Sequence, residues 1–147
     1  MYYQIDQSGK VEDTKKLTIV AFANGKTRTL KISGKEKRKL IKIMRILYSP
    51  RKTFVFKIFA GLIFLLLKDQ KIEKIDIDRE YPGHEGTIKG FLINLFNKAG
   101  KNPPQIEFAL IGKESLVHKI AIEAFRGKRK ADVIAEAQEV FGLFYTK

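Results

Sequence analysis

Alternating apolar and polar positions mark the first third of the chain. Apolar side chains recur at every second position, or in short runs, over residues 2–6, 17–22 and 27–32. This spacing predicts three β-strands. Asn24-Gly25, between the second and third runs, is a typical two-residue hairpin turn. The pattern therefore predicts an antiparallel meander of three strands.

The rest of the chain changes repeatedly between helical and strand-like spacing. Apolar residues recur every three or four positions in five segments, which predicts helices over 35–47, 53–67, 86–99, 115–125 and 132–141. Short apolar runs predict strands over 72–78 and 106–111. Because crossover helices make successive strands parallel, we expect one α/β domain over residues 1–147. Its mixed five-stranded sheet would join the meander to two parallel strands, with helices flanking both faces.

The segment from Phe54 to Leu67 is apolar on almost every side, with Lys57 as its one charged residue. It is shorter than the roughly 20 residues that a helix needs to cross a bilayer. We therefore expect a helix buried between the sheet and other helices, and no membrane association.

The net charge adds a class of partner to this picture. The chain carries 29 Lys and Arg residues against 16 Asp and Glu residues, which gives a net charge of +13. A charge of this sign and size favours a polyanion, and nucleic acid is the leading candidate. An anionic membrane surface and a solvated surface of the kind found in thermophiles are the alternatives.

Much of this charge is concentrated between Gly34 and Lys52, where eight cationic residues accompany one acid. We expect this tract to bind phosphate groups, mainly through Lys35, Lys37, Arg38, Lys39, Lys42 and Arg45. Lys57 is a further candidate, and so is a second basic tract near the C-terminus, formed by Lys128, Arg129 and Lys130. A solvated loop between helices is the alternative for that second tract.

Several chemistries are excluded by residues that the sequence lacks. There is no cysteine, which excludes disulfides, iron–sulfur clusters, cysteine–zinc sites and a cysteine nucleophile. We find no glycine-rich phosphate loop, dinucleotide fingerprint or nucleophile elbow. The first residues lack the order of a secretory signal, so we expect a cytoplasmic protein. Hydrolysis by metal-bound water is the enzymatic route that remains.

Carboxylates close two of the predicted strands. Asp6 follows the first apolar run, and Asp78 ends the strand predicted over 72–78. If the two strands are neighbours, both carboxylates meet at one edge of the sheet, where they can hold a divalent metal against a phosphate. The alternative for Asp6 is that it caps the turn before Ser8-Gly9.

Three more residues near this edge are candidates. Glu85 lies where a loop enters the next predicted helix, either as a catalytic acid or as a first-turn acid that suits the helix dipole. His84 precedes it in an exposed loop. His118 lies three residues after the N-cap candidate Ser115, as a metal ligand or as a histidine at the edge of the core.

The order of elements, together with Asp6-Gln7-Ser8-Gly9 and Asp78-Arg79-Glu80-Tyr81, resembles the ribonuclease H-like superfamily from Tyr2 to about Phe125. The resemblance implies carboxylates from two strands and two helices around two Mg²⁺ or Mn²⁺ ions. It implies Asp6, Asp78 and His118 as ligands, with Glu85 or Glu80 as an auxiliary acid. The implied activity is hydrolysis of phosphodiesters in RNA, RNA–DNA hybrid or structured DNA.

Lys57 departs from that family pattern. It stands where the first helix of the family supplies glutamate, and an ammonium group cannot ligate a metal. Three explanations keep a metal site: the register of this helix differs, the site holds one metal ion, or another acid completes it, the candidates being Glu80, Glu85, Glu114 and Glu123. Alternatively, Lys57 pairs with Asp6 or Asp78 in place of a metal, which would leave a non-catalytic nucleic-acid-binding module.

Overall fold

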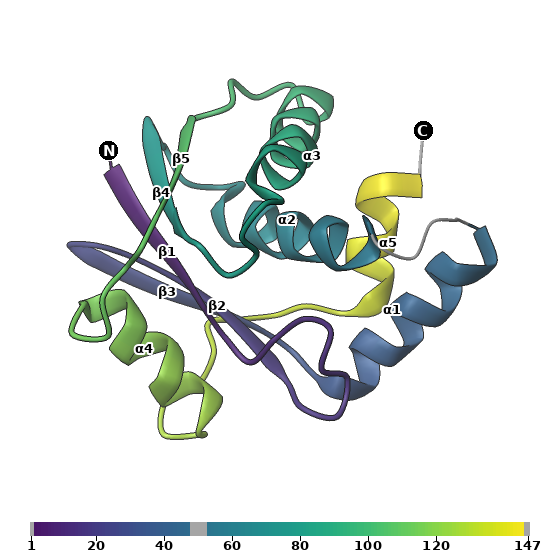
Figure 1. Ribbon diagram of the computed structural model, residues 1–147, viewed down its shortest axis with the longest axis horizontal. Helices are drawn as coiled ribbons and strands as arrows, with labels where there is room; N and C mark the ends of the chain where they lie inside the picture. The colour runs from purple at the N-terminus through teal and green to yellow at the C-terminus, as the bar shows by residue number, and fades with distance from the viewer. Residues whose placement is uncertain (1, 48–52, 146–147) are drawn as a thin grey trace.

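The computed structural model describes residues 2–47 and 53–145 (Figure 1). Within these ranges the chain forms a six-stranded mixed sheet and five helices. The strands are β1 (Tyr2–Ser8), β2 (Thr18–Asn24), β3 (Lys26–Ile32), β4 (Lys74–Asp78), β5 (Gln105–Ala109) and β6 (Val133–Ile134). The helices are α1 (Gly34–Leu47), α2 (Phe54–Leu67), α3 (Glu85–Lys98), α4 (Leu116–Phe125) and α5 (Ala137–Tyr145).

The strands lie in the order β5-β4-β1-β2-β3-β6. β1 pairs antiparallel with β2, and β2 with β3, so the predicted meander is confirmed. β4 joins the free side of β1 in parallel, and β5 joins β4 in parallel. The acids predicted to converge therefore lie on neighbouring parallel strands in the middle of the sheet.

Two predictions about the C-terminal part of the chain are wrong. The sheet has six strands in place of five, and residues 132–136 are not helical. Val133 and Ile134 form β6, which pairs in parallel with β3, and the helix begins only at Ala137. Asp132 explains the extended chain, because its Oδ2 accepts a hydrogen bond of 2.9 Å from the backbone N–H of Thr29. This contact spans 103 residues, so local periodicity could not show it.

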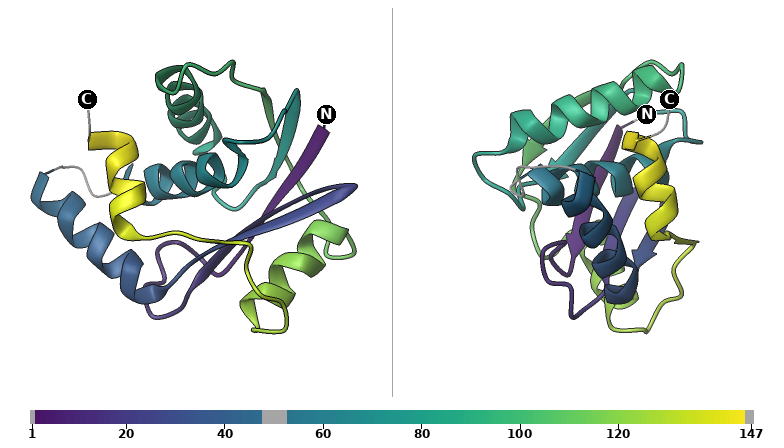
Figure 2. Two further views of the ribbon diagram at one scale, coloured as in Figure 1. Left: turned by 180° about the vertical axis from the view of Figure 1, so that it is seen from behind. Right: turned by 90° about the vertical axis from the view of Figure 1, so that its right-hand side faces the viewer.

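Helices cover both faces of the sheet, as predicted. α4 packs alone on one face, over β1 and β2, while α2 lies on the other with α1, α3 and α5 around it (Figures 1 and 2). Two separate apolar clusters correspond to the two faces. The smaller joins Ile19, Ala21 and Ala23 of β2 to α4, and the larger joins the opposite side of the sheet to α2.

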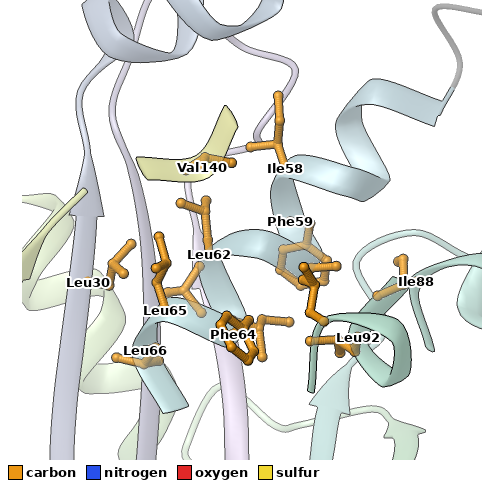
Figure 3. Packing of buried hydrophobic residues seen from close by; sticks show 14 of the residues in the cluster. Leu30, Ile58, Phe59, Leu62, Phe64, Leu65, Leu66, Ile88, Leu92 and Val140 are labelled. Carbon is orange, nitrogen blue, oxygen red and sulfur yellow. The ribbon is translucent and has the colours of Figure 1, made fainter. Parts of the chain in front are cut away.

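α2 forms the centre of the larger cluster, which confirms its predicted burial. Leu62 and Leu66 are no more than 1% exposed, and they lie on the side of α2 that faces Leu30 of β3 (Figure 3). Leu92 of α3 lies on the other side, toward Phe59 and Phe64. Burying such side chains stabilises the fold by about 2 kcal/mol each. No helix in the described ranges is both long and apolar enough to cross a membrane.

Gly9, directly after β1, has a conformation that an alanine would strain. Its φ is +81°, and an added Cβ would lie 2.4 Å from the carbonyl oxygen of Leu17 and 2.6 Å from the ring of Phe125. We expect Gly9→Ala to lower the free energy of unfolding by about 3 kcal/mol or more. Gly25→Ala is the matched control, since its φ is +66° but nothing lies within 4 Å, and it should cost about 1 kcal/mol. Urea unfolding of both variants measures the difference, and equal losses would contradict the close approach at Gly9.

Candidate metal centre

Asp6 lies within β1, two residues before its end, and faces the side of the sheet that α4 covers. Ile5 points into the larger core, so alternation along the strand turns Asp6 toward α4. Its side chain is 2% exposed. Oδ1 accepts a hydrogen bond of 2.7 Å from the N–H of Gln7. Burial raises the pKa of Asp6, an effect that the hydrogen bonds from Gln7 and His118 partly oppose.

His118 reaches Asp6 from α4. The helix begins with Ser115 as N-cap, whose hydroxyl accepts the N–H of His118, as the sequence predicts. This places the imidazole in the first turn, where Nδ1 lies 2.9 Å from Oδ2 of Asp6. With the proton on Nδ1, the ring donates to the carboxylate and holds its orientation. The structure thus brings His118 to Asp6, and its assignment as a metal ligand stays a prediction.

Asp78 and Glu80 complete a group of three acids with Asp6. One carboxylate oxygen from each of the three lies within 4.8 Å of the others. Asp78 is the last residue of β4, and its Oδ1 accepts a hydrogen bond of 2.8 Å from the N–H of Ile111. Glu80 lies in the turn that follows β4, where its N–H donates to the carbonyl oxygen of Asp78 at 2.9 Å. We call Asp6, Asp78 and Glu80 the acidic cluster.

The surroundings of Glu80 in the acidic cluster favour its protonated form. Burial raises its pKa to about 7, and the negative charges of Asp78 and Asp6, together with a hydrogen bond to Asp78, add to the effect. Lys10 opposes it. Ionising all three carboxylates costs free energy, which a bound cation would offset. Carboxylate oxygens are also the ligands that Mg²⁺ and Mn²⁺ prefer. The residues present therefore fit a hard divalent cation.

Glu85 and His84 lie outside the acidic cluster. Oε1 of Glu85 accepts a hydrogen bond of 3.0 Å from the N–H of Gly83 in the turn before α3, which is the first-turn role that the sequence left open. His84 stacks on Phe56, with ring centroids 4.2 Å apart. The third acid beside Asp6 and Asp78 is therefore Glu80 and not Glu85. The signal in the sequence was the two-residue spacing from Asp78.

Lys57 lies over aromatic side chains, away from the acidic cluster. Its Nζ is 5.6 Å from the ring centroid of Phe91, 5.9 Å from that of Phe144 and 5.4 Å from that of Tyr145. Ring faces attract cations, and burial lowers the pKa of this lysine. The hypothesis that Lys57 takes the place of a metal-binding acid beside Asp6 or Asp78 is therefore wrong. A contact between Lys57 and nucleic acid stays a prediction.

Lys37 is buried, so the prediction that it binds phosphate groups is wrong. Its side chain is 0% exposed, and Nζ donates to the carbonyl oxygens of Lys10 and Asp13 and to Oγ1 of Thr18, at 3.1, 2.7 and 2.9 Å. Burial lowers its pKa to about 8. Lys37 thereby fixes the loop between β1 and β2, which carries Lys10 toward Glu80.

Replacing Lys37 with methionine tests this structural role. The change leaves two carbonyl groups and a hydroxyl without their donor, so we expect the free energy of unfolding to fall by about 3 kcal/mol. Lys39→Met is the matched control, because Lys39 pairs with Glu36 at the surface of the same helix and should contribute less than about 1 kcal/mol. Thermal unfolding of both proteins provides the measurement. A Lys37→Met protein as stable as the wild type would contradict the structural role of the buried Lys37 hydrogen bonds.

The other predicted basic residues lie at the surface. Lys35, Lys42 and Arg45 are exposed on α1, and Arg38 donates to the carbonyl oxygen of Thr14. Beyond α4, Arg129 pairs with Glu123 at 3.1 Å, and Lys128 and Lys130 are exposed. Arg51 and Lys52, the last cationic residues of the tract from Gly34 to Lys52, lie outside the described residues. So do Ser49 and Pro50, turn formers that predict the end of the preceding helix.

Comparison with known proteins adds no relative to this picture. No protein-family model, curated protein or solved structure matches the chain. What the site can do follows from its geometry. Three carboxylates lie near or just beyond the carboxyl ends of the neighbouring strands β1 and β4, and a histidine contacts one of them. This arrangement suits the binding of a divalent cation and a phosphate.

Proposed function

We propose that this chain is a metal-dependent nuclease with a ribonuclease H-like fold, which hydrolyses phosphodiester bonds in nucleic acid. The observation that carries the proposal is the convergence of Asp6, Asp78 and Glu80, whose carboxylate oxygens lie within 4.8 Å of one another. The fold assignment is supported by the antiparallel meander β1–β3 and by the parallel strands β4 and β5 on the other side of β1.

The acidic cluster would hold Mg²⁺ or Mn²⁺, which supplies a nucleophilic water and stabilises the leaving oxygen. The protein's own groups fix the ligands. His118 orients the Asp6 carboxylate through Nδ1, and the N–H of Ile111 orients Asp78. The pKa of Glu80 is about 7 without a metal, so a bound cation would favour its ionised form and release a proton near neutral pH. Lys10 places positive charge beside Glu80, where a phosphate would approach.

The net charge of +13 supports nucleic acid as the substrate class. The test is a cleavage assay with single-stranded RNA, RNA–DNA hybrid and branched DNA, each in Mg²⁺, in Mn²⁺ and in EDTA. We expect cleavage of at least one substrate with a metal and none in EDTA. Cleavage that persists in EDTA would contradict the proposal. Tight binding of all three substrates without turnover would favour a non-catalytic module.

A further inference from the structure

A cationic pocket lies between α1, the start of α2 and the loop that joins β1 to β2. It encloses about 630 Å³, a volume within the usual range for small-ligand sites. Its lining is formed by Glu12, Thr14, Arg38, Ile41, Lys42, Arg45, Phe54 and Val55.

The lining of this pocket divides into a charged wall and an apolar floor. Arg38, Lys42 and Arg45 form the wall and give it a net positive charge, because Glu12 is the one acid among the described residues that line the pocket. The N-terminal end of α2 adds the positive end of a helix dipole. Ile41 and Val55, which are partly exposed, form the apolar floor together with the buried Phe54. A ligand that fits carries negative charge next to an apolar group, as a nucleotide does.

The pocket is close to the acidic cluster. Lys10 acts on the pKa of Glu80, and Glu12, two residues further along the loop, lines the pocket. Two extended residues span at most about 7 Å. Tyr81 also joins the two places, since it follows Glu80 and its hydroxyl donates to Oε1 of Glu12 at 3.2 Å. One nucleic-acid strand that passes over this end of the sheet would meet both.

We propose that the pocket binds an unpaired nucleotide of a single-stranded segment, with phosphates on Arg38, Lys42 and Arg45 and the base or sugar on the apolar floor. Duplex bases are stacked on one another and cannot enter a pocket of this kind, whereas unpaired bases are free to pack on apolar side chains. This inference deepens the proposed nuclease function by naming its substrate class, and it rests on that function only for the identity of the bond that is cleaved.

The test measures binding in EDTA, so that catalysis plays no part. Fluorescence anisotropy would compare a labelled single strand with a blunt duplex of equal length, for the wild type and for the double variant Lys42→Glu/Arg45→Glu. We expect the wild type to prefer the single strand. The double variant should lose at least about tenfold in affinity. The slope of log affinity against log salt concentration should become shallower by about two, as expected for the loss of about two phosphate contacts.

The matched control is Lys26→Glu/Lys68→Glu, which makes the same charge change at exposed positions away from the pocket. It should change the affinity by less than about threefold, as expected for screened charges far from the ligand. Equal losses in the two double variants, or a preference for the duplex, would overturn the proposal. Displacement of the labelled single strand by adenosine monophosphate at the same concentration as the strand would also overturn the proposal, since that result assigns the pocket to a free nucleotide.

A failure of this proposal is distinguishable from a failure of the nuclease function. Lys42→Glu/Arg45→Glu leaves the acidic cluster intact, so Mg²⁺ should raise its melting temperature as much as that of the wild type. If the double variant binds the single strand as tightly as the wild type does, while the wild type shows metal-dependent cleavage, the pocket assignment alone is wrong.

Discussion

Replacing Asp78 with Asn is expected to lower the rate of metal-dependent cleavage by at least about 10²-fold, the usual loss when one charge-stabilising group is removed from an active site. Asn keeps an oxygen that accepts the N–H of Ile111, so the local structure should be preserved. What the change removes is the negative charge next to Glu80 and Asp6. Single-turnover cleavage in saturating Mg²⁺ measures the loss.

The control for Asp78→Asn is Asp69→Asn, because Asp69 is an exposed acid that lies outside the acidic cluster. It should cleave at the wild-type rate. The melting temperature of Asp78→Asn should lie within a few degrees of the wild type or above it, since one source of repulsion is gone. Unchanged cleavage by a folded Asp78→Asn protein would show that the acidic cluster does not catalyse the reaction.

Replacing Glu80 with Gln should stabilise the metal-free protein above neutral pH. The pKa of Glu80 is about 7 in the folded chain, above its ordinary value of 4.5. Between these two values the folded state binds more protons than the unfolded state, so the free energy of unfolding falls as pH rises from about 4.5 to 7. The difference in pKa corresponds to at most about 3 kcal/mol, which partial exposure reduces to about 2 kcal/mol.

The measurement for Glu80→Gln is urea unfolding at pH 5 and pH 8, with and without Mg²⁺. Without metal, wild type and variant should differ little at pH 5, while at pH 8 the variant should be more stable by about 2 kcal/mol. Mg²⁺ should stabilise the wild type at pH 8 and the variant much less, because binding to the folded state alone raises its stability. Glu85→Gln should behave as wild type. A Glu80→Gln protein that is less stable than wild type at pH 8 would contradict the repulsion.

The sequence predicted the fold well wherever local spacing decides the structure. The three-strand meander, the buried α2 and the N-cap at Ser115 can each be read from the local spacing of apolar, polar and turn-forming residues, and all are confirmed. β6 was missed because a two-residue strand has no period. It is held by Asp132 and Thr29, which are distant in sequence.

The candidate site was predicted in part, for similar reasons. Asp6, Asp78 and His118 were correctly placed near one another, since strand ends and helix caps can be read from local patterns. The third acid was left open among four candidates, because the conformation of the turn after β4, which brings Glu80 back to Asp78, cannot be read from the sequence pattern. Lys37 was misassigned because a basic tract does not reveal that one of its lysines points inward to backbone carbonyls.

Manganese soaked into a crystal of the protein at pH 8 tests the central claim most directly. The anomalous signal of the ion shows its position without any assumption about substrate. We expect a peak within about 2.3 Å of carboxylate oxygens of Asp6, Asp78 and Glu80, and its loss in Asp78→Asn. A well-occupied peak elsewhere, with none at the acidic cluster, would contradict the assignment of these three residues as a metal centre.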